Sequence, residues 1–170
     1  MNFSAKMLRD EALANKVIVV TGGGSGLGKA MTRYFLELGA RVAITSRNLE
    51  KLEKTAQELQ LETGGNCLAV ACDVRHYDQV EAMLAAVIAA YGRVDVLVNN
   101  AGIGYFGSIE ESEEAEVRKM FEINVFGLAK MTQEVLPHMR KQRSGHILNI
   151  ASIAGLRSFP GVGFYNATKY

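Results

Sequence analysis

The feature that most constrains the fold of this chain is a run of glycines, residues 21–28, between a short apolar segment and a helical pattern. The apolar segment, Val17–Thr21, is rich in β-branched residues and ends at glycines, as a buried parallel strand does. The helix predicted after the glycines ends at Gly39. Its apolar positions predict a single stripe: Leu27, Ala30, Met31, Tyr34, Phe35 and Leu38.

Strand and helix patterns alternate along the rest of the chain. Further strands are predicted at residues 41–46, 66–72, 94–99 and 146–151. Helices are predicted at residues 49–62, around residues 80–91, and in a long region between about 112 and 143 that Pro137 is expected to kink or shorten. Strands separated by helices of this length imply right-handed crossovers and a parallel sheet covered on both faces. We therefore predict a single α/β domain, a Rossmann-type doubly wound parallel sheet with strand order 3-2-1-4-5.

Composition and charge exclude several classes of function. The chain has 170 residues, of which 48% are hydrophobic, and a net charge of +1. That balance is typical of a globular domain with a core and argues against a general nucleic-acid binder. No apolar run approaches the roughly 18 residues of a membrane span, and residues 1–12, an extension before the domain, contain no signal-peptide core. We expect a cytoplasmic protein that contacts neither nucleic acid nor membrane.

The two cysteines, Cys67 and Cys72, lie in or beside the predicted third strand. We interpret them as small core residues, because a disulfide is disfavoured in a reducing compartment and further metal ligands are lacking. The three histidines are scattered without the spacing of metal ligands. No metal site is predicted.

The glycine run has a chemical interpretation. Glycines let a backbone turn sharply and let a phosphate approach it, while the free amides of a helix N-terminus face the anion. The stretch does not satisfy the dinucleotide pattern G-x-G-x-x-G in any register, and it lacks the Gly-Lys-Ser/Thr ending of a P-loop. It fits G-x-x-x-G-x-G from Gly22 to Gly28. A merely flexible turn is the alternative, but the position between a strand and an amphipathic helix favours a cofactor site.

Near the C-terminus, Tyr165 and Lys169 are four residues apart and would share one face of a helix. A tyrosine phenol is ordinarily too weak an acid to exchange protons efficiently at neutral pH, and a neighbouring ammonium favours the phenolate. Ser152 follows the fifth predicted strand. By themselves these residues are better interpreted as an exposed aromatic and a turn cap.

Together, these motifs resemble the short-chain dehydrogenase/reductase family, whose T-G-x-x-x-G-x-G stands at residues 21–28. The first half is more similar to dienoyl-CoA reductase-like members and the second to general carbonyl reductases. The resemblance spans about residues 13–170. Further family motifs follow in order: Asp73-Val74, N-N-A-G at residues 99–102, Asn124, Ser152, and Y-x-x-x-K from Tyr165 to Lys169, with Ser152 and Tyr165 at the family's spacing of 13.

The resemblance implies an oxidoreductase that moves a hydride between a nicotinamide cofactor and a carbonyl or alcohol. Cofactor choice is expected at Ser46 and Arg47, because an arginine pairs with a 2′-phosphate whereas NAD binders tend to place an acid there. We therefore predict NADP (NADPH) rather than NAD. The predicted cofactor-binding residues are Thr21, Gly22, Gly24, Ser25, Gly26, Leu27, Gly28, Ser46, Arg47, Asp73, Val74, Asn100, Ala101, Gly102, Tyr165 and Lys169.

The resemblance also implies four catalytic residues. Tyr165 would be the general acid in reduction and the base in oxidation, and Ser152 would stabilise the negative charge that develops on the substrate oxygen. Lys169 would hold the nicotinamide ribose, and Asn124 would help to hold the lysine through a water.

Family members continue past the Y-x-x-x-K motif with two further strands and a substrate loop, whereas this chain ends at Tyr170. We therefore expect a C-terminally incomplete domain with weak or no turnover and a weakened family-type homo-oligomer. The alternatives are a catalytically silent NADP-binding fragment and an interaction module. The apolar stretches at residues 103–106 and 153–163 favour a hydrophobic small-molecule substrate.

Overall fold

A computed structural model describes residues 8–170, so residues 1–7 of the predicted N-terminal extension lie outside the described part. Five parallel strands form one sheet in the order β3-β2-β1-β4-β5. The strands are β1 (Val17–Thr21), β2 (Arg41–Ser46), β3 (Asn66–Ala71), β4 (Val96–Asn99) and β5 (His146–Asn149). The α/β class, the single domain and the strand order are confirmed.

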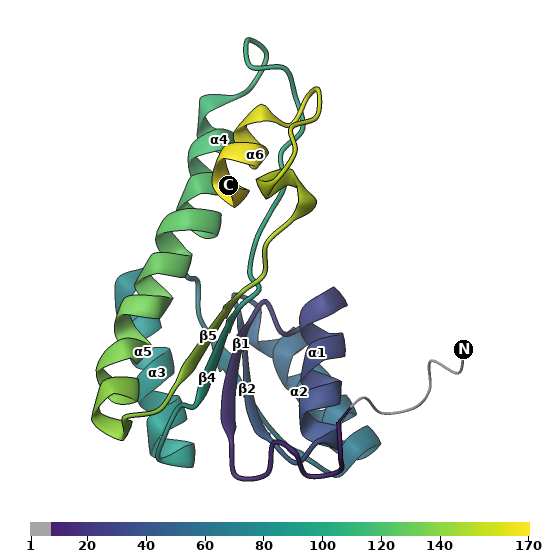
Figure 1. The fold of residues 1–170 in the computed structure, drawn as a ribbon, viewed down its shortest axis with the longest axis vertical. Coiled ribbons are helices and arrows are strands. Elements are labelled where there is room, and N and C mark those ends of the chain that lie inside the picture. The colour runs from purple at the N-terminus through teal and green to yellow at the C-terminus, as the bar shows by residue number, and fades with distance from the viewer. Residues whose placement is uncertain (1–7) are drawn as a thin grey trace.

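Helices cover both faces of the sheet (Figure 1). On one face lie α1 (Gly26–Glu37) and α2 (Leu49–Thr63); on the other lie α3 (Tyr77–Tyr91) and α5 (Leu128–Gln142). Alternate residues of β1 point to opposite faces, so Val17 and Val19 join the core under α3 and α5, while Ile18 and Val20 join the core under α1 and α2.

The first half of the long helical region is α4 (Glu114–Phe121), and it runs into α5 through a π-helical turn, η1 (Glu122–Gly127). The short 3₁₀ turn η2 (Ile153–Gly155) and the helix α6 (Gly163–Lys169) follow β5, and α6 lies beside α4 (Figure 1). Pro137 lies inside α5, which continues past it. The interruption of the long helix is therefore the π turn and lies earlier than Pro137.

The predicted apolar stripe of α1 is confirmed in part: Leu38 is fully buried and Met31 and Phe35 pack against the core, but Leu27 and Ala30 are exposed. The face that meets the sheet carries Gly28, Thr32 and Leu36, whereas Leu27 is 70% exposed. The reason lies at Gly28, where a Cβ would come within 2.8 Å of the Asn100 side-chain nitrogen. Only the glycine face of the helix can approach the loop after β4 so closely, and this contact sets the rotation of the whole helix.

Among residues 8–170, none of the helices combines the length and the apolar character that crossing a membrane requires.

Candidate active site

Thr21, the last residue of β1, joins two of the predicted motifs. Its buried Oγ1 accepts hydrogen bonds from the backbone N–H groups of Asn100 at 3.0 Å and Ala101 at 2.9 Å. The Asn100 side chain donates in return to the Thr21 carbonyl at 2.9 Å. These bonds fix the glycine turn and the loop after β4 side by side, at the carboxyl edge of the sheet where ligands of such folds bind.

Glycine is needed at position 22 for two reasons. Its φ of 67° lies in the left-handed region, which other residues adopt at a cost. A Cβ there would also sit 3.0 Å from the Asn100 side-chain nitrogen. The glycine turn is therefore tight, and it leaves the backbone amides at the N-terminus of α1 accessible to an anion.

A cleft of about 430 Å³ lies along this edge of the sheet. It is lined by predicted cofactor residues from every motif of the first three βα units and from the N-N-A-G loop. They are Gly22, Ser25, Leu27, Gly28, Ser46, Arg47, Asp73, Val74, Asn100, Ala101 and Gly102.

Four further residues of the cleft wall were not predicted: Thr45, Cys72, Ile103 and Ile123. Thr45, Cys72 and Ile103 are each adjacent in sequence to a predicted cofactor residue, so their positions near the ends of strands could have indicated them. Ile123 comes from the π turn, and no signal in the sequence marks that turn.

The remaining predicted cofactor residues do not line the cleft. Thr21 and Gly24 are buried supports, and the Gly24 carbonyl accepts from the Thr55 hydroxyl at 3.2 Å. Gly26 begins α1 with a positive φ of 53°. Tyr165 and Lys169 lie on α6, beyond the N-N-A-G loop.

Asp73 lies on the cleft wall as a paired carboxylate. It accepts from the Arg75 Nε at 2.9 Å and from the Arg75 backbone N–H at 3.1 Å. The Arg75 guanidinium holds the pKa of Asp73 below its ordinary value, so the group is charged at neutral pH. Arg47, in contrast, is exposed at the cleft and forms no ion pair within residues 8–170.

Both cysteines are buried and free, in agreement with their prediction as core residues. Burial raises the pKa of Cys67 to about 12 and the pKa of Cys72 to about 11. Only Cys72 lines the cleft. The two thiols are therefore neutral at physiological pH and poor nucleophiles.

Tyr165 and Lys169 lie on α6, whose inner side meets the loop after β4. The Lys169 Nζ donates to the carbonyl of Ile150 at 3.0 Å, and a Cβ on Gly102 would lie 3.6 Å from that nitrogen. The Tyr165 ring lies beside Gly104, where a Cβ would be 4.0 Å from the ring. The side chains of Tyr165 and Lys169 thus lie beside residues 102–104 of the loop after β4.

Asn124 lies in the π turn and is 4% exposed. Its Oδ1 accepts from the Ile103 N–H at 2.9 Å, and its Nδ2 donates to the Ile103 carbonyl at 2.8 Å and to the Thr168 hydroxyl at 3.0 Å. The predicted contact was with Lys169 through a water. That contact stays a prediction; in the structure Asn124 bonds Thr168, the residue before the lysine, and so joins α6 to the loop after β4.

Ser152 lies between β5 and η2. Its hydroxyl oxygen accepts from the Ala154 N–H at 3.2 Å and caps the 3₁₀ turn. The side chain is half-buried, and its hydroxyl proton is left to donate to another group. A capping role and contact with a bound oxygen are therefore compatible.

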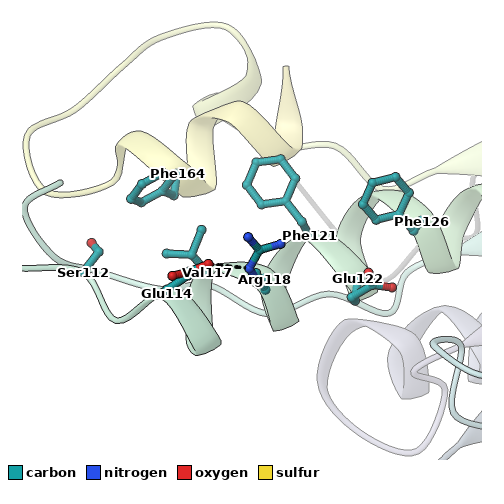
Figure 2. Close-up of a pocket in the computed structure, with 8 residues that line it drawn as sticks. All are labelled: Ser112, Glu114, Val117, Arg118, Phe121, Glu122, Phe126 and Phe164. Carbon is teal, nitrogen blue, oxygen red and sulfur yellow. Dashed lines mark hydrogen bonds and ion pairs between the residues drawn. The ribbon is translucent and has the colours of Figure 1, made fainter.

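A second hollow of about 470 Å³ lies between α4 and α6 (Figure 2). The rings of Phe121, Phe126 and Phe164 give it an apolar lining, and the ion pair of Arg118 with Glu114 borders it. It contains none of the predicted site residues. The candidate site is therefore the cleft at the strand ends, together with the adjoining face of α6.

Comparison with known proteins identifies relatives. A family model described as short chain dehydrogenase matches residues 16–170. An uncharacterized oxidoreductase of Staphylococcus saprophyticus is 38% identical over 157 residues, which cover 92% of this chain and 62% of that protein. A mouse protein named dehydrogenase/reductase SDR family member 7B is 38% identical over 161 residues, covering 93% of this chain and 50% of that protein. The chain thus spans about half to two thirds of the length of these curated relatives.

Solved structures agree with the strand order and the helix arrangement. A metagenomic short-chain oxidoreductase in complex with NADP superimposes with a TM-score of 0.86 at 39% identity, covering 92% of this chain and 71% of that chain. A xylitol dehydrogenase bound to NAD⁺ superimposes with a TM-score of 0.87 at 31% identity, covering 93% of this chain and 61% of that chain. Structural relatives with either nicotinamide cofactor therefore share this fold.

Proposed function

The chain belongs to the short-chain dehydrogenase family, and on that premise we propose that it transfers a hydride between NADP and a carbonyl or alcohol substrate. The observation that carries this proposal is the continuity of the cleft with the catalytic motif. The glycine turn, Arg47 and the N-N-A-G loop line one cleft. The loop after β4 continues from this motif, and there the Lys169 side chain lies beside Gly102 and the Tyr165 ring beside Gly104.

The chemistry of the cleft residues fits a dinucleotide. Positions 22 and 28 have no room for a Cβ, so the backbone there can approach a pyrophosphate, which the N-terminus of α1 attracts. The exposed Arg47 guanidinium would pair with a 2′-phosphate. Neither Ser46 nor Arg47 is an acid that would bind both ribose hydroxyls of NAD. These features support NADP as the preferred cofactor.

When bound, the reduced nicotinamide would supply the hydride. The Tyr165 hydroxyl would donate the proton to the carbonyl oxygen in reduction and accept it in alcohol oxidation. The Ser152 hydroxyl would donate a hydrogen bond to the same oxygen and stabilise its developing negative charge. Lys169, which keeps two ammonium hydrogens beyond its bond to Ile150, would bind the ribose. Asn124 would hold α6 in place through Thr168.

The substrate would be hydrophobic. Phe106, in the loop after β4, is 75% exposed, and Ile153, next to Ser152, is 64% exposed. Ile153 follows Ser152 in sequence, and a Cβ on Gly104 would lie 3.3 Å from the Phe106 ring and 4.0 Å from the Tyr165 ring. Apolar side chains beside a proton donor would bind the body of a ketone, aldehyde or secondary alcohol.

The test is the oxidation of NADPH by the purified protein with a panel of hydrophobic ketones and aldehydes. Turnover, even if slow, that is lost in Tyr165→Phe would support the proposal. Saturable NADPH binding without turnover of any member of the panel would favour the alternative, a cofactor-binding module without catalysis. The absence of both NADPH binding and turnover would contradict the proposal.

A further inference from the structure

Asn166 follows the candidate catalytic tyrosine and was not singled out in the sequence. It is 8% exposed. Its Nδ2 donates to the carbonyl of Ala154 at 2.6 Å and to the carbonyl of Arg157 at 3.1 Å. Both partners are acceptors, so they fix the orientation of the amide, with nitrogen toward the turn. The side chain thus bridges α6 to the segment that follows Ser152.

The segment that Asn166 holds is the one that carries the Ser152 hydroxyl. The Ala154 N–H bonds the Ser152 Oγ at 3.2 Å, and the Ala154 carbonyl bonds Asn166. The Gly155 N–H donates to the Ser152 carbonyl at 2.9 Å. One buried residue, Ala154, therefore connects the serine hydroxyl to the side chain next to Tyr165.

The same turn touches α6 at a second point. A Cβ on Gly155 would overlap the Lys169 carbonyl oxygen and lie 2.9 Å from the Lys169 carbonyl carbon. The 3₁₀ turn η2 is therefore in close contact with α6 at two places, residue 166 next to Tyr165 and residue 169 itself. Two separated contacts restrain both the distance and the tilt of the turn against the helix.

The Asn166 Oδ1 is buried and has no hydrogen-bond partner within residues 8–170. An unpaired buried oxygen destabilises a fold, and an apolar side chain of similar size would avoid that cost. What the amide supplies here, and an apolar residue could not, is the pair of donor bonds to the turn.

We propose that Asn166 is a positioning residue that holds the Ser152 hydroxyl in register with Tyr165. The inference rests on the proposed function for its catalytic consequence, but its structural half stands apart from it. A displacement of about 1 Å between two groups that act on one oxygen lowers a rate by as much as roughly 100-fold. Asn166 acts through the turn and need not touch the substrate.

The experiment compares the wild-type protein with Asn166→Asp, Asn166→Ala and a control, Asn66→Asp, at the start of β3 and outside the cleft. A carboxylate in place of Asn166 keeps the size but loses both donors and would repel the two carbonyls, and the alanine loses the donors without adding charge. The Asn66 Oδ1 accepts from the Tyr91 hydroxyl at 2.7 Å, a role that an aspartate oxygen performs equally well. Amide hydrogen exchange of residues 152–158, NADPH affinity, kcat and KM are measured for each.

We expect both Asn166 variants to speed exchange at Gly155 and Leu156 by about tenfold or more, because the turn loses its anchor. We also expect kcat to fall roughly 10- to 100-fold while NADPH affinity and the substrate KM stay within about twofold. Asn66→Asp should match the wild type in every measurement.

Unchanged exchange in the turn of a folded variant would overturn the proposal, as would faster exchange with unchanged kcat. Equal losses in kcat, substrate KM and cofactor affinity would also overturn it, because they indicate general disruption. If the wild type binds NADPH without turnover of any substrate, the proposed function fails, and the exchange rates still decide whether Asn166 anchors the turn.

Discussion

The Lys169 ammonium donates a hydrogen bond to the carbonyl oxygen of Ile150, 3.0 Å away, and so ties α6 to the residue that follows β5. A second tie is the bond from Asn124 to the Thr168 hydroxyl at 3.0 Å. A helix of 7 residues has little stability by itself. The position of Tyr165 is therefore set by these tertiary contacts more than by the helix.

Replacing Tyr165 by phenylalanine tests the assignment of the proton donor. The change removes one oxygen and leaves the ring beside Gly104. We expect NADPH-dependent turnover to fall by roughly 100-fold or more, with the NADPH Kd within about twofold of wild type. Tyr77→Phe is the matched control, since Tyr77 lies outside the cleft and its hydroxyl donates to Glu134 at 2.9 Å. Equal activity in the two variants would show that the phenol of Tyr165 moves no proton.

Replacing Thr21 by valine tests the link between the glycine turn and the N-N-A-G loop. The isosteric change leaves the Ala101 N–H without its acceptor and leaves the Asn100 N–H only its bond to the Val98 carbonyl. We expect a loss of about 1–3 kcal/mol in the free energy of unfolding, measured with urea, together with weaker NADPH binding.

The control for that change is Thr32→Val, which is equally buried. The Thr32 hydroxyl only donates to the Gly28 carbonyl of its own helix, at 2.8 Å, so its removal strands no donor. The expected loss is below about 1 kcal/mol. If the two variants lose the same stability, the Thr21 hydroxyl does not organise the cleft.

Much of the fold follows from local pattern, because β-branched runs that end at glycine or polar residues mark buried strands. The start and end of β2, from Arg41 to Ser46, were predicted to the residue. The inward face of α1 was predicted only in part, because Leu27 is exposed where Gly28 contacts the distant Asn100. Asn166 was not predicted, because its partners at residues 154 and 157 are joined to it only by tertiary packing.

The candidate site also contains residues that the sequence predicts and residues that it does not. Glycines, Arg47 and the N-N-A-G loop lie at strand ends, where the order of a parallel sheet brings them together. The π turn that places Ile123 in the cleft has no signature in sequence, since its backbone pattern differs from an α-helix by one extra residue.

Thiol labelling tests the burial of the cysteines and the place of Cys72 in the cleft. Because burial raises the pKa of Cys67 to about 12 and that of Cys72 to about 11, both thiols should react slowly in the native protein and fast in urea. Saturating NADPH should slow the labelling of Cys72 more than that of Cys67, since only Cys72 lines the cleft. Equal protection of both cysteines would indicate global stabilisation instead of contact with the ligand.

The pair of Asp73 and Arg75 predicts a dependence of stability on pH. Arg75 lowers the pKa of Asp73 in the folded state, so the pair contributes stability above the unfolded value of about 3.9 and loses it as the pH falls through the folded pKa. Arg75→Gln should therefore lose less stability than wild type between about pH 7 and pH 3.

The control for the pH experiment is Arg118→Gln, which breaks the exposed pair with Glu114. Exposed pairs contribute little, so its pH dependence should follow the wild type. Identical curves for the wild type and Arg75→Gln, measured by urea unfolding, would show that the Asp73 pair carries no acid sensitivity.

The most direct test of the account is a titration of the protein with NADPH and, in parallel, with NADH, followed by the fluorescence of the cofactor. The account predicts saturable binding of NADPH at least about tenfold tighter than NADH, because a charged hydrogen bond contributes about 1.5–3 kcal/mol. Arg47→Ala should bring the two affinities within about twofold by weakening NADPH alone. Lys54→Ala, which removes an exposed cation of α2 outside the cleft, should change neither affinity. Equal affinities in the wild type would contradict the role of Arg47, and the absence of binding by either cofactor would contradict the cofactor site itself.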